Sequence, residues 1–543
     1  MTSRYFVGVD VGTGSARAGI FDRRGDMVST AKREIALYQD GADFVEQSSD
    51  DIWQAVCASV REALAAAELD GNDIGGLGFD ATCSLVVLGP DGTPLTVGSH
   101  GDDTRNIIVW MDHRATDQAR RINETKHRVL DYVGGVISPE METPKLLWLK
   151  EHLPATYEAA WQFFDLTDFL TWRATASLAR SVCTVTCKWT YLAHEGRWDE
   201  SYFRQVGLSD LAENGFARIG TEIVPAGRAL GQGLTPQAAS ELGLNPGTPV
   251  GAGLIDAHAG GVGSVGARGG TGSATTRMAY VFGTSACTMA SSAEPVFIPG
   301  LWGPYYSAMI PGLWLSEGGQ SAAGAAIDQL VSFHPATSEA RSKADEQGLS
   351  LPSWLADIAA SRAVTASDAA CLAGELMVVP EFLGNRSPNA DPEARALVSG
   401  LGMERDLDSL VSLYVAGILG LGYGLRQIIA ASRAQGATID TIALSGGAGR
   451  HPLIRQLLAD CTGISVLVSR QSDPVLLGAA MLGATAATAF DNLESAMETM
   501  SSVGEIFHPT GGEVAALHDR RFAAFEALQK SATSARRIMN GEK

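Results

Sequence analysis

The chain has 543 residues, of which 45% are hydrophobic and 19% are charged, and its formal net charge is −20. This composition is typical of a globular protein with a large core, and the length suggests two or three domains at roughly 100–200 residues each. The acidic balance argues against nucleic acid or an anionic membrane surface as the main partner.

The cysteines and the apolar runs indicate a protein of the cytoplasm. None of the seven cysteines forms a CxxC pair, so we expect reduced thiols. Cys183 and Cys187 could share one face of a helix, but no His or Cys with metal-site spacing lies nearby in the sequence, so we expect no metal there. We find no basic segment and apolar run of a signal peptide, and the apolar residues 413–425 are too short and glycine-rich to span a bilayer.

The first part of the chain predicts strands, a helix and then a strand–helix unit. Residues 5–11 and 16–22 form a predicted hairpin around a Gly-Thr-Gly-Ser turn. Residues 50–69 form a predicted helix, with Asp50 or Asp51 as its cap. The expected apolar face of this helix consists of Ile52, Val56, Val60 and Leu64. Strand–turn–strand follows over residues 74–89, and residues 246–266 predict a strand, a polar turn and a glycine-rich helix.

The same order of elements then starts again. We expect strand–turn–strand over 277–292 and strand–loop–helix over 312–331, followed by a long apolar helix over 407–436. The last predicted units are strand–glycine turn–helix over 441–463, a strand over 464–470 and a helix over 473–487. This is a duplication at an offset of about 270 residues, far longer than a solenoid repeat. We place the boundary in the small, polar residues 262–275, which gives domains 1–262 and 263–543.

Each half contains a turn that suits phosphate. Backbone N–H groups and hydroxyls of small residues make a concave donor site for phosphate oxygens. The residues expected to contact phosphate are Gly12, Thr13, Gly14 and Ser15 in the first turn and Gly283, Thr284 and Ser285 in the second. Neither turn has the pattern of a P-loop. Two such turns in matching places predict a nucleotide triphosphate held between the halves. Asp10, just before the first turn, could hold a hydrated Mg²⁺ or simply cap the turn.

These motifs identify a family. "DVGTGSARAG", "FGTSA", "LSGGAGRHPLIRQLLAD", "PEFLGNRSPNADPEARA" and "DPVLLGAAMLGA" resemble motifs of the FGGY family of carbohydrate kinases, and the resemblance covers about residues 5–490. It implies an α/β protein of two duplicated ribonuclease-H-like domains, the actin/hexokinase/Hsp70-like ATPase fold, with a catalytic cleft between them. It further implies that ATP with Mg²⁺ and a sugar bind there. Outside the turns, the resemblance implies nucleotide contacts by Gly324, Asp328, Gly446, Gly447, Ala448 and His451. At the last position some members of the family have Asn or Ser instead of His451.

Asp256 is the predicted catalytic residue. By sequence alone it is equally a helix cap or a base at the junction of a strand and a helix. Phosphoryl transfer to a hydroxyl needs a proton acceptor, and the resemblance assigns that role to Asp256, with Mg²⁺ contact as a further role beside Asp10. The resemblance assigns the sugar to Ala81, Cys83, Ser84, Trp110, Asp112, Lys188, Asp256 and Glu317. The alternatives are a core position for Trp110 and a solvated surface position for Lys188.

The "TCSLV" string, residues 82–86, resembles the D-ribulokinase branch, so the expected reaction is ATP-dependent phosphorylation of a free ketopentose, D-ribulose, to the 5-phosphate. Ribitol, L-ribulose, D-xylulose or another pentulose or pentitol remains an alternative, although a His-Gly pair of xylulokinases and an Arg-Glu pair of glycerol kinases are missing. A non-catalytic ATP-binding sensor and an activator-dependent ATPase on the same fold also stay open. The expected partners are ATP and a sugar, without nucleic acid or membrane, and a homodimer is a further alternative.

Overall fold

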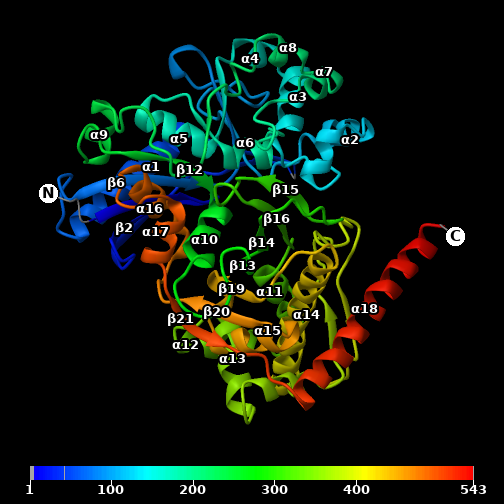
Figure 1. Ribbon diagram of the computed structural model, residues 1–543. Helices are drawn as coiled ribbons and strands as arrows, with labels where there is room; N and C mark the ends of the chain where they lie inside the picture. Colours follow the sequence, from blue (N-terminus) through cyan, green and yellow to red (C-terminus); the bar gives the residue numbers. More distant parts are fainter. Residues whose placement is uncertain (1–4, 42, 542–543) are drawn as a thin grey trace.

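The computed structural model describes residues 5–41 and 43–541 and contains two similar halves, each built on a sheet (Figure 1). The sheet of the first half has the strand order β12-β6-β1-β2-β3. Its strands are β1 (Tyr5–Val11), β2 (Ser15–Asp22), β3 (Met27–Glu34), β6 (Ile74–Ala81) and β12 (Val250–Ile255). The first three strands are antiparallel neighbours, whereas β6 and β12 run parallel to β1.

The sheet of the second half repeats this pattern and has the order β15-β16-β14-β13-β19-β20-β21. Its strands are β13 (Arg277–Phe282), β14 (Ala286–Ser292), β15 (Trp302–Tyr306), β16 (Trp314–Gln320), β19 (Thr441–Ser445), β20 (Ser465–Ser469) and β21 (Val503–Phe507). The run β20-β19-β13-β14-β16 corresponds in order and direction to β12-β6-β1-β2-β3. The two halves therefore have the duplicated architecture that the sequence predicts.

Two helices cross from one half to the other. Helix α10 (Asp256–Val265) follows β12 but packs against β13, and α16 (Pro474–Ala486) follows β20 but packs against β1 and β6. The two helices also pack on each other so closely that a Cβ on Gly478 would lie 2.0 Å from the carbonyl oxygen of Ala259. A Cβ on Gly263 would lie 2.0 Å from the carbonyl oxygen of Pro474, so the glycines of this region serve close helix contact.

A second, smaller sheet in the first half has the order β4-β5-β8-β7-β9. Its strands are β4 (Tyr38–Asp40), β5 (Phe44–Gln47), β7 (Leu85–Leu88), β8 (Ile107–Ile108) and β9 (Gln162–Asp165). The expected strands in residues 74–89 are both present, but they separate: β6 joins the large sheet and β7 joins the small one. The remaining strands are β10 (Arg180–Ser181), β11 (Ile223–Val224), β17 (Met377–Val379) and β18 (Leu397–Ser399).

The helices around the sheets agree with the sequence in type and differ in some ends. Helix α1 (Ser49–Ala66) buries its expected apolar face, but Ser48 is its cap: the Ser48 hydroxyl accepts a hydrogen bond from the Asp51 N–H at 3.4 Å. Helix α10 begins directly at Asp256, without the expected polar turn. The other helices are α2 (Thr116–Glu124), α3 (Glu142–His152), α4 (Pro154–Ala159), α5 (Leu166–Thr175), α6 (Val182–Lys188), α7 (Glu200–Gln205), α8 (Ser209–Glu213), α9 (Pro236–Leu242), α11 (Gly324–Ser332), α12 (Thr337–Glu346), α13 (Leu351–Arg362), α14 (Leu407–Ala434), α15 (Pro452–Thr462), α17 (Leu493–Met500) and α18 (Glu513–Met539).

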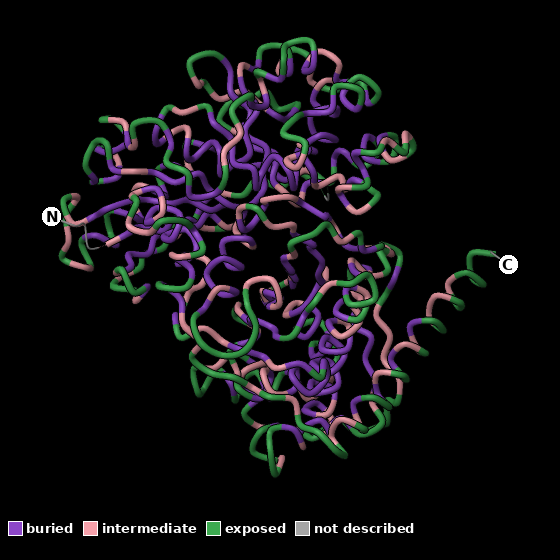
Figure 2. Tube along the Cα trace, viewed as in Figure 1, coloured by how far each residue is buried: buried purple, intermediate pink, exposed green. Residues whose placement is uncertain are grey.

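Helix α14 is a core helix of the second half. Its 28 residues are enough to cross a membrane by length and composition, whereas residues 413–425 alone are too few. In the structure 72% of its most apolar window is buried against the rest of the protein, as the purple interior of Figure 2 illustrates. Burial inside a protein accounts for this apolar composition.

Candidate active site

A cavity of about 550 Å³ lies between the two halves, and both predicted phosphate turns line it. The first turn contributes Gly12, Thr13 and Ser15, and the second contributes Gly283, Thr284 and Ser285. Each turn closes on itself in a similar way: the Gly12 N–H donates to the Ser15 carbonyl at 3.0 Å, and the Gly283 N–H donates to the Ser285 carbonyl at 2.9 Å. The fold thus brings together two turns that lie about half the chain apart.

The first turn is held rigidly and keeps free donors. Trp110 Nε1–H donates to the Thr13 hydroxyl at 3.0 Å, and the Gln47 side-chain amide donates to the Thr13 carbonyl at 2.8 Å. Among the residues that the structure describes, the backbone N–H groups of Thr13 and Gly14 meet no protein acceptor. Such unpaired, neighbouring N–H groups are suited to an anion.

Three carboxylates gather where the strands of the first sheet end. Asp10 and Asp80 are partners in the parallel pair β1–β6, and Asp256 follows the end of β12. Arg17 Nε–H donates to Asp10 at 2.7 Å, and the same guanidinium donates to Asp473 at 2.6 Å. Asp10 and Asp256 line the cavity.

The close carboxylates disfavour one another's charge. Burial, and next the charge of Asp10, raises the pKa of Asp256 to about 6. The same two causes raise the pKa of Asp80 well above its ordinary value, and both carboxyl oxygens of Asp80 are buried without a hydrogen-bond partner. A carboxylate with a pKa near 6 is ionised at neutral pH and is a stronger proton acceptor than an ordinary Asp.

Lys188 and Glu317 line the same cavity from opposite halves. Lys188 ends α6 and is only 7% exposed, and its Nζ lies 5.3 Å from the ring centre of Trp302. No hydrogen bond or ion pair joins the Lys188 ammonium to another described residue, so its donors face the cavity. Glu317, in β16, is 6% exposed; burial opposes its charge, but His258, Lys188 and Arg386 hold its pKa at about 2.

The other predicted sugar residues divide into two groups. Cys83 and Trp110 line the cavity, whereas Ala81, Ser84 and Asp112 are fully buried behind it. The Ser84 hydroxyl accepts from the Trp110 N–H at 3.1 Å. Asp112 accepts from the Arg114 guanidinium at 2.8 Å and from the Val45 N–H at 2.6 Å, so its carboxylate is occupied by the protein. Direct sugar contact by the buried group stays a prediction.

A second cavity, of about 500 Å³, shares Gly283 and Thr284 with the first. It is lined by the predicted residues Gly324, Asp328, Gly447, Ala448 and His451 together with apolar side chains that include Tyr414 and Ile418. His451 caps α15: its Nδ1 accepts from the Leu453 N–H at 3.1 Å. Gly446 has φ +95°, and a Cβ there would lie 2.4 Å from the Phe282 carbonyl oxygen. A cavity with an apolar wall next to a phosphate turn suits a nucleoside.

Comparisons with known proteins decide the family. Residues 5–263 match the N-terminal domain of the FGGY family of carbohydrate kinases, and residues 278–487 match its C-terminal domain. The chain belongs to the FGGY family of carbohydrate kinases. It is therefore a sugar kinase, and ATP binding follows from the family.

Relatives of this FGGY kinase span its length. It is 46% identical to an FGGY carbohydrate kinase domain-containing protein of Homo sapiens, over 99% of this chain and 98% of the relative. It is 38% identical to a D-ribulokinase of Saccharomyces cerevisiae, over 90% of this chain and 73% of the relative. The xylulose kinase of Lactobacillus acidophilus has the same fold, with a TM-score of 0.79, 18% identity and coverage of 97% of this chain and 98% of that one. The predicted two-domain actin/hexokinase-like fold is thereby confirmed.

Sequence reasoning missed several residues on the cavity wall of this FGGY kinase. Arg386 lies over the ring of Trp302, with its guanidinium carbon 4.7 Å from the ring centre. Arg386 also pairs with Glu140 at 3.8 Å and so links the second half to the first across the cavity. The motif containing Arg386 was part of the resemblance, but nothing local marks Glu140 or Trp302 as its partners.

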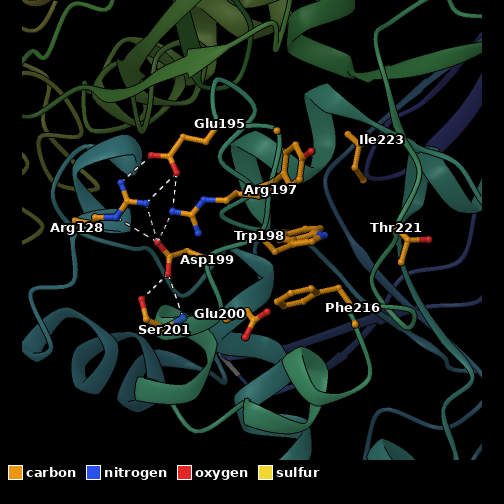
Figure 3. A pocket seen from close by; sticks show the side chains of 13 residues that line it. Arg128, Glu195, Arg197, Trp198, Asp199, Glu200, Ser201, Phe216, Thr221 and Ile223 are labelled. Carbon is orange, nitrogen blue, oxygen red and sulfur yellow. Dashed lines mark hydrogen bonds and ion pairs between the residues drawn. The ribbon is translucent and has the colours of Figure 1, made fainter.

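A larger hollow, of about 860 Å³, lies elsewhere, at Arg128, Glu195, Arg197 and Asp199 (Figure 3). Figure 3 shows that its charged groups face one another: Arg128 pairs with Glu195 and Asp199 at 2.8 Å each, and Arg197 pairs with Glu195 at 2.7 Å. It contains none of the predicted site residues. Since its charges are neutralised within the protein, we assign the reaction to the cavity between the halves.

Proposed function

We propose that this FGGY kinase phosphorylates free D-ribulose to D-ribulose 5-phosphate with ATP. The observation that carries the proposal is that Asp256, Lys188 and Glu317 share one cavity with both phosphate turns. The 38% identical relative is a D-ribulokinase, and a relative from Halalkalibacterium halodurans with 27% identity is a ribulokinase.

The chemistry of the cavity suits a polyhydroxyl acceptor. Lys188 donates to sugar oxygens, and Glu317 accepts from sugar hydroxyls. The terminal hydroxyl oxygen attacks the γ-phosphorus, the bond from that phosphorus to the β–γ bridging oxygen breaks, and ADP leaves. Asp256 takes the hydroxyl proton. The two turns hold the phosphate oxygens between them, and the nucleoside occupies the second cavity beside Gly447 and His451.

We also propose that Mg²⁺ accompanies ATP at the cluster of carboxylates. The buried oxygens of Asp80 have no partner, and carboxylates are ligands that Mg²⁺ prefers, so the residues fit the ion. Asp10 and Asp256, which line the cavity, would hold it, and Asp80 lies buried beside Asp10 as its partner in the β1–β6 pair. The ion would neutralise charge on the transferred phosphoryl group.

Three further predictions accompany this proposal. The chain divides into domains 1–262 and 263–543, with the boundary inside α10 (Asp256–Val265). Of the two crossing helices, α16 belongs to the second domain by sequence and lies on the sheet of the first. A cytoplasmic location and a homodimer also stay predictions.

A coupled ADP-release assay with D-ribulose, D-xylulose, L-ribulose and ribitol tests the substrate. D-Ribulose and D-xylulose differ only at carbon 3, and a buried hydrogen bond left unmade costs about 1–3 kcal/mol. We expect kcat/KM for D-ribulose to exceed that for D-xylulose by at least about tenfold, within that range. Equal use of both sugars would contradict the proposal. ADP release without sugar would favour an ATPase, and no ADP release with any sugar would favour a sensor.

A further inference from the structure

Behind the cavity, three buried side chains form a continuous row, Cys183–His258–Glu317. The Cys183 sulfur lies 3.0 Å from His258 Nδ1, and His258 Nε2 lies 3.5 Å from Glu317 Oε2. All three side chains are almost completely buried. The Ile255 N–H also donates to the Cys183 sulfur, at 3.4 Å, so this sulfur is an acceptor on a fixed frame.

The row joins the three elements that carry Lys188, Asp256 and Glu317. Cys183 lies on α6, which ends with Lys188. His258 lies on α10, two residues after Asp256, and Glu317 lies on β16 of the other half. A shift of any one element would therefore change the contacts of the row.

Glu317 depends on His258 for its orientation. Glu317 Oε2 is buried, and no described group donates a hydrogen bond to it; His258 Nε2 at 3.5 Å is its nearest ionic partner. A carboxylate only accepts, so the proton on Nε2 faces Glu317, while Nδ1 faces the sulfur. The ring has one neighbour on each nitrogen, which fixes its rotation.

The same region could be considered as a metal site. Ligand atoms of Cys183, Cys187 and His258 lie within 4.8 Å of one another, so the fold supplies the histidine that the sequence spacing did not show. Structural zinc sites take four ligands at about 2.0–2.3 Å from the ion. Here only three ligand atoms converge among the described residues, and Cys183 already accepts from Ile255 and contacts the ring at hydrogen-bond distance. The geometry favours a row of buried polar side chains, joined by one hydrogen-bond contact and one ion pair, over a metal centre.

We propose that His258 is a positioning residue that holds the Glu317 carboxylate toward the sugar, and that Cys183 in turn holds the His258 ring. This inference rests on the proposed function, because it assigns Glu317 to the sugar. Among the described residues no hydrogen bond or ion pair joins the row to the phosphate turns or to the nucleoside cavity, so we expect the row to act on the sugar.

The test compares KM for D-ribulose and KM for ATP in His258→Gln, Glu317→Gln and the double variant. We expect each single variant to raise KM for D-ribulose about tenfold, and KM for ATP to stay within about twofold. The double variant should be no worse than Glu317→Gln alone, because the two residues act as one unit. Fully multiplicative losses would overturn the proposal, because they would mean that the two residues act independently.

Cys183 provides a milder pair of variants in case His258→Gln does not fold. Cys183→Ser keeps a small acceptor and should keep KM for D-ribulose within about twofold, whereas Cys183→Ala should raise it about fivefold or more. Equal values for the two variants would overturn the role of Cys183. One equivalent of zinc in the purified protein, lost in Cys183→Ala, would also overturn the proposal.

A second buried histidine gives a matched control. His518 contacts the Tyr423 hydroxyl at 3.0 Å and the Cys461 sulfur at 3.6 Å, in the second half and away from the cavity. His518→Gln should lower the thermal midpoint and leave KM for D-ribulose unchanged.

If the wild type uses another pentulose instead, the substrate proposal fails, and the same variants measured on that sugar decide the positioning role separately. If it uses no sugar, both proposals fall.

Discussion

Replacing Asp256 by Asn should have opposite effects on turnover and on stability. The side chain keeps its size, but it can no longer accept the hydroxyl proton. Loss of a general base costs on the order of 10²–10⁴ in rate, so we expect kcat to fall by that factor. Binding of sugar and ATP should stay within roughly tenfold, or about 1.4 kcal/mol, because the amide still hydrogen-bonds.

The stability effect follows from the raised pKa of Asp256. The rise from an ordinary 3.8 to about 6 means that the ionised carboxylate costs the folded protein at most about 3 kcal/mol above pH 6. Because Asp256 is half-buried at the cavity wall, exposure to solvent reduces this cost, and a gain of about 1–2 kcal/mol in Asp256→Asn is expected. An Asp in the unfolded chain ionises near pH 3.9, so the cost is absent below about pH 4 and grows as the pH rises to 6.

Thermal unfolding of the ligand-free wild type and Asp256→Asn between pH 4 and 8, together with ADP release at pH 7.5, checks both effects. The difference in thermal midpoint should be small at pH 4, should increase toward pH 6 and should then stay constant. More than a tenth of wild-type kcat in the variant would refute the role of Asp256 as base. A variant no more stable than the wild type above pH 6 would refute the explanation of its pKa.

Three other changes test the rest of the cavity. Lys188→Met should lower kcat/KM for D-ribulose about 5- to 150-fold and leave KM for ATP unchanged, and unchanged sugar kinetics would refute the assignment of Lys188 to the sugar. The control Lys150→Met removes a surface ion pair with Asp210 at 2.5 Å and should change neither quantity. Arg386→Met and Glu140→Gln should each raise KM for D-ribulose, and the rise in the double variant should be smaller than the product of the two single rises. The same substitutions in the exposed pair Arg121–Glu151 are the control and should leave this KM unchanged, whereas a fully multiplicative rise for Arg386 and Glu140 would exclude coupling across the cavity. Small-angle scattering should show a smaller radius of gyration with D-ribulose and a non-hydrolysable ATP analogue, and an unchanged radius would count against closure of the halves.

The parts of this fold that follow from local pattern could be predicted from the sequence. The strands on either side of each Gly-Thr turn, and the buried face of α1, follow from alternation and helical spacing over a few residues. The duplication was visible because both halves use the same order of elements. Helix ends were less certain, since Ser48 rather than Asp50 or Asp51 caps α1.

Contacts between distant segments could not be predicted in the same way. The sequence spacing around Cys183 and Cys187 gave no reason to expect His258, because α6 meets the end of β12 and the start of α10 only through the folding of the first half, about 70 residues further along the chain. The Glu140–Arg386 pair likewise depends on how the two halves face each other. The family resemblance assigned Asp112 to the sugar, and only the structure shows its carboxylate satisfied by Arg114 and Val45.

The duplication also explains why the cavity has one candidate base and not two. The crossing helices α10 and α16 follow equivalent strands, and each has an aspartate at its start: Asp256 is the first residue of α10, and Asp473 caps α16. Arg17 neutralises Asp473 at 2.6 Å and Asp10 at 2.7 Å, but no cation pairs with Asp256 among the described residues. Asp473, the counterpart of Asp256, thereby links the start of α16 to Arg17 on β2, close behind the first phosphate turn. Asp256 is left without a cation, so burial and next the charge of Asp10 raise its pKa, which suits the proposed role of proton acceptor.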